Sequence, residues 1–358
     1  MNSLRRTALY DEHVAAGARL VPFAGWEMPV QYSGVINEVR AVREHCGVFD
    51  VSHMGQILVE GTATTRALND VISADWSQTP IERAAYALLL NTDGGVLDDI
   101  MGYRLGPEQW FIVTNASRAE IDEAHLKAHL PQLTFQVPYA NRAMLALQGP
   151  RAEALLQPLV EDVALAQMQW RDCAAATLSG AHGLLARGGY TGSDGFEFMF
   201  NGHDAPRVWQ ALLDTGVTPC GLGARDVLRL EAGLPLYGHE LREAWTPFES
   251  GCGWAVKFDK GDFIGRTALE SRRTPERRIR GLKMQGRAIP REGYPVSQNG
   301  ETIGEVTSGS LSPTIGCGIA LAMLAASVEK GERVDVLIRG VPYPAEVVPP
   351  PFVAHGRK

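Results

Sequence analysis

The chain has few cysteines, no long apolar run and no excess of positive charge, and each absence excludes a class of protein. Its five cysteines (Cys46, Cys173, Cys220, Cys252 and Cys317) are odd in number, lie far apart and form no Cys-x-x-Cys pair. A disulfide framework and a zinc ribbon are therefore not expected, and a reducing compartment suits the chain. We expect no metal site.

Hydropathy and charge argue against membrane proteins and general nucleic-acid binders. Nowhere do about 18 apolar residues follow one another, so no membrane span is expected. The N-terminal segment 1–10 contains arginines without an apolar run behind them, which is unlike a secretory signal. The net charge is −7, from 34 basic and 41 acidic residues, so nucleic acid is not an expected partner.

The length of 358 residues predicts two or three domains, and the order of helices and strands predicts the α+β class. Segments 86–91, 96–104 and 109–114 are separated by short glycine-containing turns. They predict an antiparallel meander, because parallel strands need a long crossover. The predicted helices span residues 38–46, 117–130 (opened by a capping box of Ser117 and Glu120), 151–160, 204–213 and 224–232.

A change in composition marks the last domain boundary. Residues 271–291 hold eight basic residues and one acidic residue, Glu276. Short strand-like runs separated by turns such as Asn299-Gly300 follow, and they predict a small all-β barrel or sandwich. The basic segment is either an interaction surface or a solvated linker, and we favour the linker.

Two stretches far apart in the chain, 94–103 and 189–197, each place a carboxylate and a tyrosine beside a glycine-rich turn. In a regular strand, Asp98 and Asp99 lie on opposite faces, and Asp99 shares its face with Tyr103. We interpret Asp98 as a cap of the neighbouring turn, a role that explains Asp99 poorly. Tyrosine offers a flat apolar face, and carboxylate accepts two parallel hydrogen bonds, so together they suit a planar heterocycle with N–H donors, such as a pterin.

Other charged or glycine-rich features leave alternatives open. Arg225 and Arg229 lie four residues apart on one predicted helical face, and surface charges or site residues are equally good interpretations. The loop that begins at Gly221 lacks the third glycine of a dinucleotide cradle, so no nucleotide is expected. His53 follows Ser52 directly, and we interpret it as a buried structural histidine rather than half of a hydrolytic pair.

Eight segments together carry a family resemblance. The first are Phe-Ala-Gly-Trp-Glu-Met-Pro-Val-Gln-Tyr (23–32), Gly-Val-Phe-Asp-Val-Ser-His-Met-Gly (47–55) and Gly-Gly-Val-Leu-Asp-Asp (94–99), and the others are 189–197, 221–238, 260–266, 307–313 and 351–353. Through these segments the chain resembles the glycine cleavage system T protein, the tetrahydrofolate-dependent aminomethyltransferase, over nearly its whole length. Gly102, Ser193 and Cys317 depart from the family pattern.

The resemblance implies a three-domain cloverleaf of mostly antiparallel sheets with flanking helices. Residues 1–275 would form the folate-binding region, as two interleaved subdomains made of 1–52 plus 140–275 and of 53–139. Residues 276–358 would form a jelly-roll-like β-barrel. Because no transit peptide is visible, we expect a bacterial cytoplasm, with a mitochondrial location only if such a peptide has been removed.

The resemblance also implies the reaction and its participants. The methylene carbon of an aminomethyl group on the lipoylated H protein would pass to tetrahydrofolate, with release of ammonia and formation of 5,10-methylenetetrahydrofolate. Tetrahydrofolate would be a co-substrate, with no metal and no nucleotide. The resemblance assigns the catalytic role to Asp99 and folate binding to Met54, Tyr103, Asn115, Tyr190, Glu197, Arg225 and Arg357.

Three other functions are weighed against this one. RNA-modification or regulatory relatives carry a Lys-Gly-Cys-Tyr-like segment, whereas Lys260-Gly-Asp-Phe here has no cysteine. The demethylating folate domain of a flavin-linked oxidase is fused to a flavoprotein half, for which 358 residues leave no room. A non-catalytic scaffold would leave the acids of the site without a role.

Overall fold

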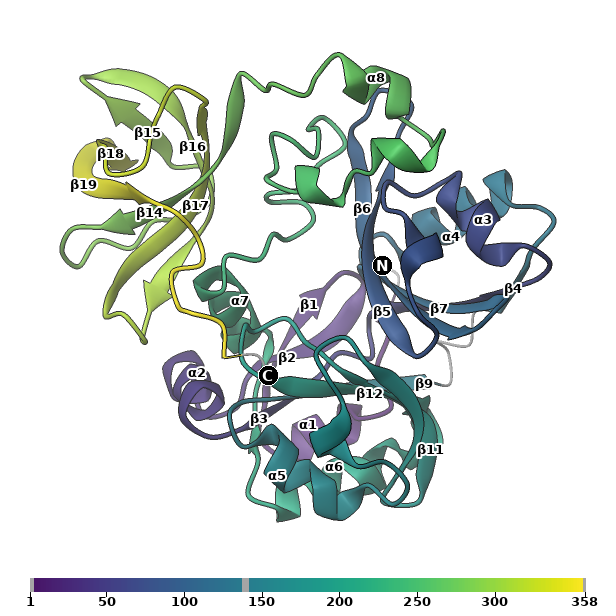
Figure 1. Ribbon diagram of the computed structural model, residues 1–358. Helices are drawn as coiled ribbons and strands as arrows, with labels where there is room; N and C mark the ends of the chain where they lie inside the picture. Colours follow the sequence, from purple (N-terminus) through teal and green to yellow (C-terminus); the bar gives the residue numbers. More distant parts are fainter. Residues whose placement is uncertain (1–2, 137–141, 357–358) are drawn as a thin grey trace.

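The computed structural model describes residues 3–136 and 142–356, and its three lobes surround a common centre (Figure 1). Each lobe is built on one sheet: a six-stranded sheet, a five-stranded sheet and a closed six-stranded barrel. This is the α+β arrangement with a C-terminal barrel that the sequence predicts. Across the described ranges 3–136 and 142–356, no helix has the length and apolar character needed to cross a membrane.

The five-stranded sheet contains the predicted meander. Its strand order is β5-β6-β7-β4-β8, and all its pairs are antiparallel. The turn between β5 and β6 is held by Asn91, whose Oδ1 accepts the N–H groups of Asp93 (3.0 Å) and Gly95 (2.8 Å). The elements of this lobe are β4 (Gly55–Glu60), α3 (Thr64–Asn69), β5 (Arg83–Leu90), β6 (Val96–Gly106), β7 (Gln109–Thr114), α4 (Ala119–His129) and β8 (Thr134–Gln136).

The predicted capping box at the start of α4 is wrong. The N-cap residue is Arg118, and no side-chain hydrogen bond caps this helix end. The carboxylate of Glu120 forms an ion pair with Arg5 instead. A tertiary partner on the N-terminal segment has therefore taken the side chain that the local pattern assigned to the cap.

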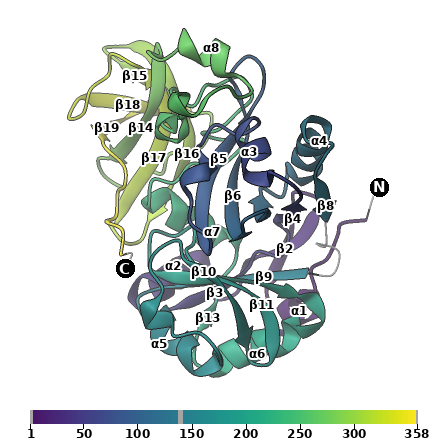
Figure 2. The ribbon, with the colours of Figure 1, turned by 45° about the vertical axis from the view of Figure 1, so that its right-hand side comes forward.

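The six-stranded sheet has the order β10-β11-β12-β9-β3-β13, and β13 pairs with β3 in parallel. Helices α5 and α6 lie on its outer side in both views (Figures 1 and 2). The strands are β3 (Gly47–Asp50), β9 (Arg142–Gln148), β10 (Cys173–Leu178), β11 (Ala181–Arg187), β12 (Gly195–Asn201) and β13 (Thr218–Pro219), with β1 (Arg19–Phe23) and β2 (Trp26–Gln31) as a separate hairpin. The helices are α1 (Tyr10–Ala15), α2 (Val35–Glu44), α5 (Ala152–Leu156), α6 (Ala205–Asp214) and α7 (Leu222–Glu231).

The five predicted helices all occur, with ends that differ from the prediction. Helix α2 begins three residues early, because the Glu38 carboxylate accepts the backbone N–H groups of Tyr32 (2.6 Å) and Ser33 (2.9 Å) and so fixes the chain ahead of the helix. Helix α5 is shorter than predicted and continues as a 3₁₀ turn at Gln157–Leu159.

The C-terminal lobe is a closed antiparallel barrel with the order β14-β17-β16-β15-β18-β19. Much of the basic segment is not a solvated linker, because residues 277–284 form strand β14 and Arg277 pairs with Glu249 at 2.9 Å. We keep the expected division at 52/53 and 275/276 as a proposal, which the sheet composition supports. The expected boundary at 139/140 lies outside the described residues. The elements are α8 (Arg266–Glu270), which precedes the barrel, and β14 (Arg277–Met284), β15 (Pro295–Gln298), β16 (Glu301–Ser312), β17 (Cys317–Ala325), β18 (Arg333–Ile338) and β19 (Val341–Val348).

Candidate functional site

A cavity of about 840 Å³ lies where the three lobes meet. Its walls include Asp99 from β6, Glu197 from β12, Arg225 from α7 and Leu321 from the barrel strand β17. The cavity is therefore formed only when all three lobes are in place. Seven of the eight residues expected in the site line it, namely Met54, Asp99, Tyr103, Asn115, Tyr190, Glu197 and Arg225. The eighth, Arg357, lies outside the described residues.

Asp99 is held by two polar neighbours in one wall of the cavity. Its carboxylate accepts hydrogen bonds from the Tyr86 hydroxyl (3.2 Å) and from Asn115 Nδ2 (2.8 Å). Burial, followed by the charge of the adjacent Asp98, raises the pKa of Asp99 to about 7. This side chain can therefore exist in either protonation state near neutral pH.

Asp98 lies on the other face of β6, as strand alternation predicts, but its predicted role is wrong. It does not cap the turn, which Asn91 holds. Its fully buried carboxylate accepts the backbone N–H of Asn115 (3.0 Å) and Asn115 Nδ2 (2.9 Å). Asp98 and Asp99 thus both accept hydrogen bonds from Asn115.

The second acid, Glu197, faces a cationic and aromatic wall. The Tyr103 hydroxyl donates to Glu197 Oε2 at 3.2 Å, and the Arg225 guanidinium lies 4.9 Å from the centre of the Tyr190 ring. Burial raises the pKa of Glu197, and the facing charge of Arg225 opposes that rise. Nη1 of Arg225 is buried and has no hydrogen-bond partner within the described part of the chain. An unmatched donor at a cavity wall is an open position for a ligand acceptor.

The interpretation of Arg225 and Arg229 as surface charges is wrong, because Arg229 is buried and Arg225 lines the cavity. Arg229 pairs with Glu240 at 2.9 Å and donates to Ser308 Oγ on β16 at 2.7 Å. Arg225 thus points into the cavity, and Arg229, one turn later on α7, joins that helix to the barrel.

Tyr86, Trp254 and His53 are among the cavity residues that were not expected from the sequence. Tyr86 stacks on the half-exposed Trp254 with ring centres 5.1 Å apart, and its hydroxyl reaches Asp99. Strand register could have revealed Tyr86, because Leu88 lies opposite Asp99 and Tyr86 shares the face of Leu88. His53 is buried, as expected, but it lines the cavity, and burial lowers its pKa to about 4.

A histidine pair and a glycine-rich loop are the two features that most resemble metal and nucleotide sites. His125 and His129 are four residues apart on α4, a pair that the sequence expectation of no metal site overlooked. Over residues 3–136 and 142–356, no cluster of three or more His, Cys, Asp or Glu could hold a metal ion. The Gly221 loop donates its first N–H to the Glu38 carboxylate at 2.9 Å, so a side chain of this protein occupies its anion position.

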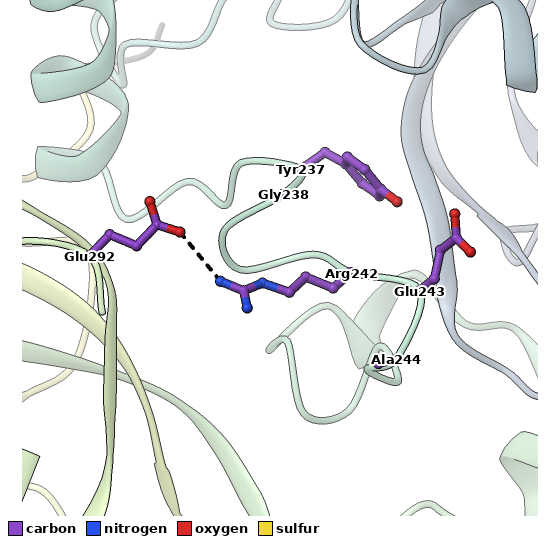
Figure 3. Close-up of a pocket in the computed structure, with 6 residues that line it drawn as sticks. All are labelled: Tyr237, Gly238, Arg242, Glu243, Ala244 and Glu292. Carbon is purple, nitrogen blue, oxygen red and sulfur yellow. Dashed lines mark ion pairs between the residues drawn. The ribbon is translucent and has the colours of Figure 1, made fainter. Parts of the chain in front are cut away.

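A second, shallower cleft of about 510 Å³ opens between residues 237–244, named the central segment here, and the barrel (Figure 3). Across it, Arg242 from the central segment pairs with Glu292 at 3.5 Å. Tyr237 lines both this cleft and the central cavity. The cleft is lined by Tyr237, Gly238, Arg242, Glu243, Ala244 and Glu292.

Comparisons with known proteins agree with this geometry. The family description "GCVT N-terminal domain" matches residues 9–260, and "Glycine cleavage T-protein C-terminal barrel domain" matches residues 277–354. The chain belongs to the glycine cleavage T-protein family. It is accordingly an aminomethyltransferase of the glycine cleavage system, a family that uses tetrahydrofolate.

Proteins similar to this chain match it over nearly its whole length. The chain is 47% identical to an aminomethyltransferase of Symbiobacterium thermophilum, over 98% of this chain and 97% of the relative. It is 45% identical to one of Herpetosiphon aurantiacus, over 98% of each. The crystal structure of the glycine cleavage system aminomethyltransferase T from Bartonella henselae superposes with a TM-score of 0.93 at 35% identity, covering 99% of each chain.

Proposed function

We propose that this aminomethyltransferase moves the methylene carbon of an aminomethyl group, carried on the lipoyl arm of H protein, to tetrahydrofolate. The carbon loses its bonds to sulfur and to the amino nitrogen and gains bonds to N5 and N10 of the folate. The two protons displaced from N5 and N10 leave on ammonia and on the dihydrolipoyl thiol. The product is 5,10-methylenetetrahydrofolate.

The observation that carries the proposal is the pair of acids on separate walls of one cavity, Asp99 and Glu197. Glu197 can accept two parallel N–H groups from the edge of a pterin. Tyr103 holds this carboxylate, and the Arg225 guanidinium supplies the opposite charge. We assign Met54 and Tyr190 to the apolar and aromatic walls beside the ring.

Asp99 has the features of the catalytic residue. A carboxylate there stabilises the positive charge that develops on the carbon and nitrogen atoms during transfer. Asn115 and Tyr86 hold it in one orientation, and holding the two reactants in line can itself supply up to about 7–11 kcal/mol. A pKa of about 7 also allows Asp99 to take up a proton from the folate amine.

The partner of this reaction is the lipoylated H protein. We assign Arg357, which lies outside the described residues, to folate binding and contact with the H protein on family resemblance alone. Nucleic acid and membrane have no part in the proposal, and we place the enzyme in a bacterial cytoplasm.

Calorimetric titration with 5-formyltetrahydrofolate, a stable reduced folate, tests the binding half of the proposal. The catalytic half is tested by Asp99→Asn, which keeps the shape of the side chain and removes its charge. Methylene transfer from aminomethyl-H protein should fall by at least about 100-fold in kcat. Asp93→Asn, an exposed acid in the same hairpin, is the matched control and should keep wild-type turnover. Lack of folate binding at millimolar ligand, or full turnover in Asp99→Asn, contradicts the proposal.

A further inference from the structure

A further buried acid lies beside Asp98 and outside the cavity. Asp122 belongs to α4, is fully buried and does not line the cavity. Its carboxyl group lies within hydrogen-bonding reach of the carboxyl group of Asp98. Two ionised carboxylates only accept hydrogen bonds and repel one another, so one member of this pair must carry a proton.

The surroundings of the two acids decide which one carries the proton. Asp98 accepts two N–H groups, the backbone N–H of Asn115 and Asn115 Nδ2, and both favour its ionised form. Both oxygens of Asp122 are buried, and neither accepts an N–H or hydroxyl group from the residues that the structure describes. The proton therefore belongs on Asp122.

Charged and titratable neighbours of Asp122 do not change this assignment. Arg118, one turn earlier on α4, is near enough to act on Asp122, but its guanidinium pairs with Glu243 at 2.8 Å and lies 4.9 Å from the centre of the Tyr237 ring. The acids Asp98 and Asp99 on β6 also act on Asp122, and their charges oppose its ionisation.

The same hydrogen bonds reach Asp99 through Asn115. Asn115 Nδ2 lies 2.9 Å from Asp98 Oδ1 and 2.8 Å from Asp99 Oδ1, so its two hydrogens are both used. The orientation of the amide is thereby fixed, because turning it over would place Oδ1 against two acids. The side-chain oxygen Oδ1 of Asn115 is then the polar atom of this amide that is left for the cavity.

We propose that Asp122 is a positioning residue for methylene transfer: its carboxyl group stays protonated and donates a hydrogen bond to Asp98, which keeps Asp98 ionised as the anchor of Asn115 and Asp99. The inference rests on the proposed role of Asp99. Burial and the charge of Asp98 raise the pKa of Asp122 to about 11, in agreement with a protonated side chain at neutral pH. The charge retained on Asp98 is also one cause of the raised pKa of Asp99.

Two variants separate the hydrogen bond from mere occupancy of space. Asp122→Asn keeps an N–H donor for Asp98, so kcat should stay within about threefold and its acid limb should stay near the wild-type pH. Asp122→Leu removes the donor, so Asp98 takes up the proton and no longer raises the pKa of Asp99. The acid limb of kcat should then move to lower pH by on the order of one unit, with the dissociation constant for 5-formyltetrahydrofolate unchanged. Glu120→Gln, an exposed acid on the same helix, is the control and should match wild type.

A spectroscopic measurement tests the proton itself, whatever Asp99 does. At about pH 9, well below the pKa of Asp122 of about 11, the infrared difference between wild type and Asp122→Asn should contain the C=O stretch of a protonated carboxyl group. Absence of that band overturns the inference even in a fully active enzyme. An Asn variant whose acid limb moves as far as that of the Leu variant also overturns it. If wild type shows the band but Asp99→Asn retains full turnover, the proposed role of Asp99 fails while the proton on Asp122 stands.

Discussion

Glu197→Gln is the substitution that tests the folate-binding wall most directly. It keeps the shape of the side chain, removes the charge that faces Arg225, and replaces one acceptor oxygen by a donor. One ligand N–H would then lose its acceptor in a buried site, at a cost of about 1–3 kcal/mol. At 1.4 kcal/mol for each factor of ten, this corresponds to a loss of about 5- to 140-fold in affinity.

The assay is calorimetric titration of the folded variant with 5-formyltetrahydrofolate. Tyr103→Phe is the matched comparison, because it removes the hydroxyl that donates to Glu197 (3.2 Å) and leaves the carboxylate in place. The binding free energy lost in Tyr103→Phe should not exceed about 1.5 kcal/mol, the net contribution of one ordinary hydrogen bond. Equal affinities for wild type and Glu197→Gln would show that Glu197 is a structural acid, and the assignment of this wall to the pterin edge would be refuted.

Three further predictions follow from the same geometry. Asp98→Asn should lower kcat about tenfold, on the order of 1.4 kcal/mol, because an amide cannot accept both N–H groups of Asn115; unchanged single-turnover rates would contradict the anchoring role. Asp122 is protonated in the folded state and ionises at about pH 4 when unfolded. As the pH rises from about 4, the free energy of unfolding of wild type should therefore fall relative to that of Asp122→Asn. The fall, measured by urea titration, should be at most about 4 kcal/mol at pH 7. An equal difference in unfolding free energy between the two proteins at pH 4 and pH 7 would argue against a protonated Asp122. If residues 271–291 steer H protein, its apparent KM should rise with salt as the screening length falls from about 30 Å to about 10 Å, whereas free aminomethyl-lipoate should respond little. Equal salt sensitivity would reject the docking role.

Local patterns predicted the parts of the site that lie within single strands. Period-two alternation placed Asp99 and Tyr103 on one face of β6, and the glycine turns predicted the antiparallel meander. The strand-forming residues 277–284 escaped notice because their basic side chains look like those of a solvated linker. Glu249, which accepts an ion pair from Arg277, lies in a different segment and gave no local signal.

Long-range pairs account for most of what the sequence did not reveal. The true partner of Asp98 is Asn115, just beyond the end of β7, and no spacing rule joins these positions. The burial of Arg229 depends on Glu240 and on Ser308 in the barrel, so a helical wheel could not distinguish it from a surface residue. Family resemblance identified Arg225, whereas periodicity alone left it open.

Helix α7 links ligand binding in the central cavity to the stability of all three lobes. Arg225 on this helix lines the cavity, and Arg229 one turn later fastens the helix to the barrel. A ligand that binds only where all three lobes meet must be released when any of them unfolds. Folate at 100 times its dissociation constant would therefore raise the free energy of unfolding of each lobe by about 2.7 kcal/mol. Heat-absorption peaks that are separate in the empty protein should draw together as folate is added, so that the ligand makes three folding units melt as one.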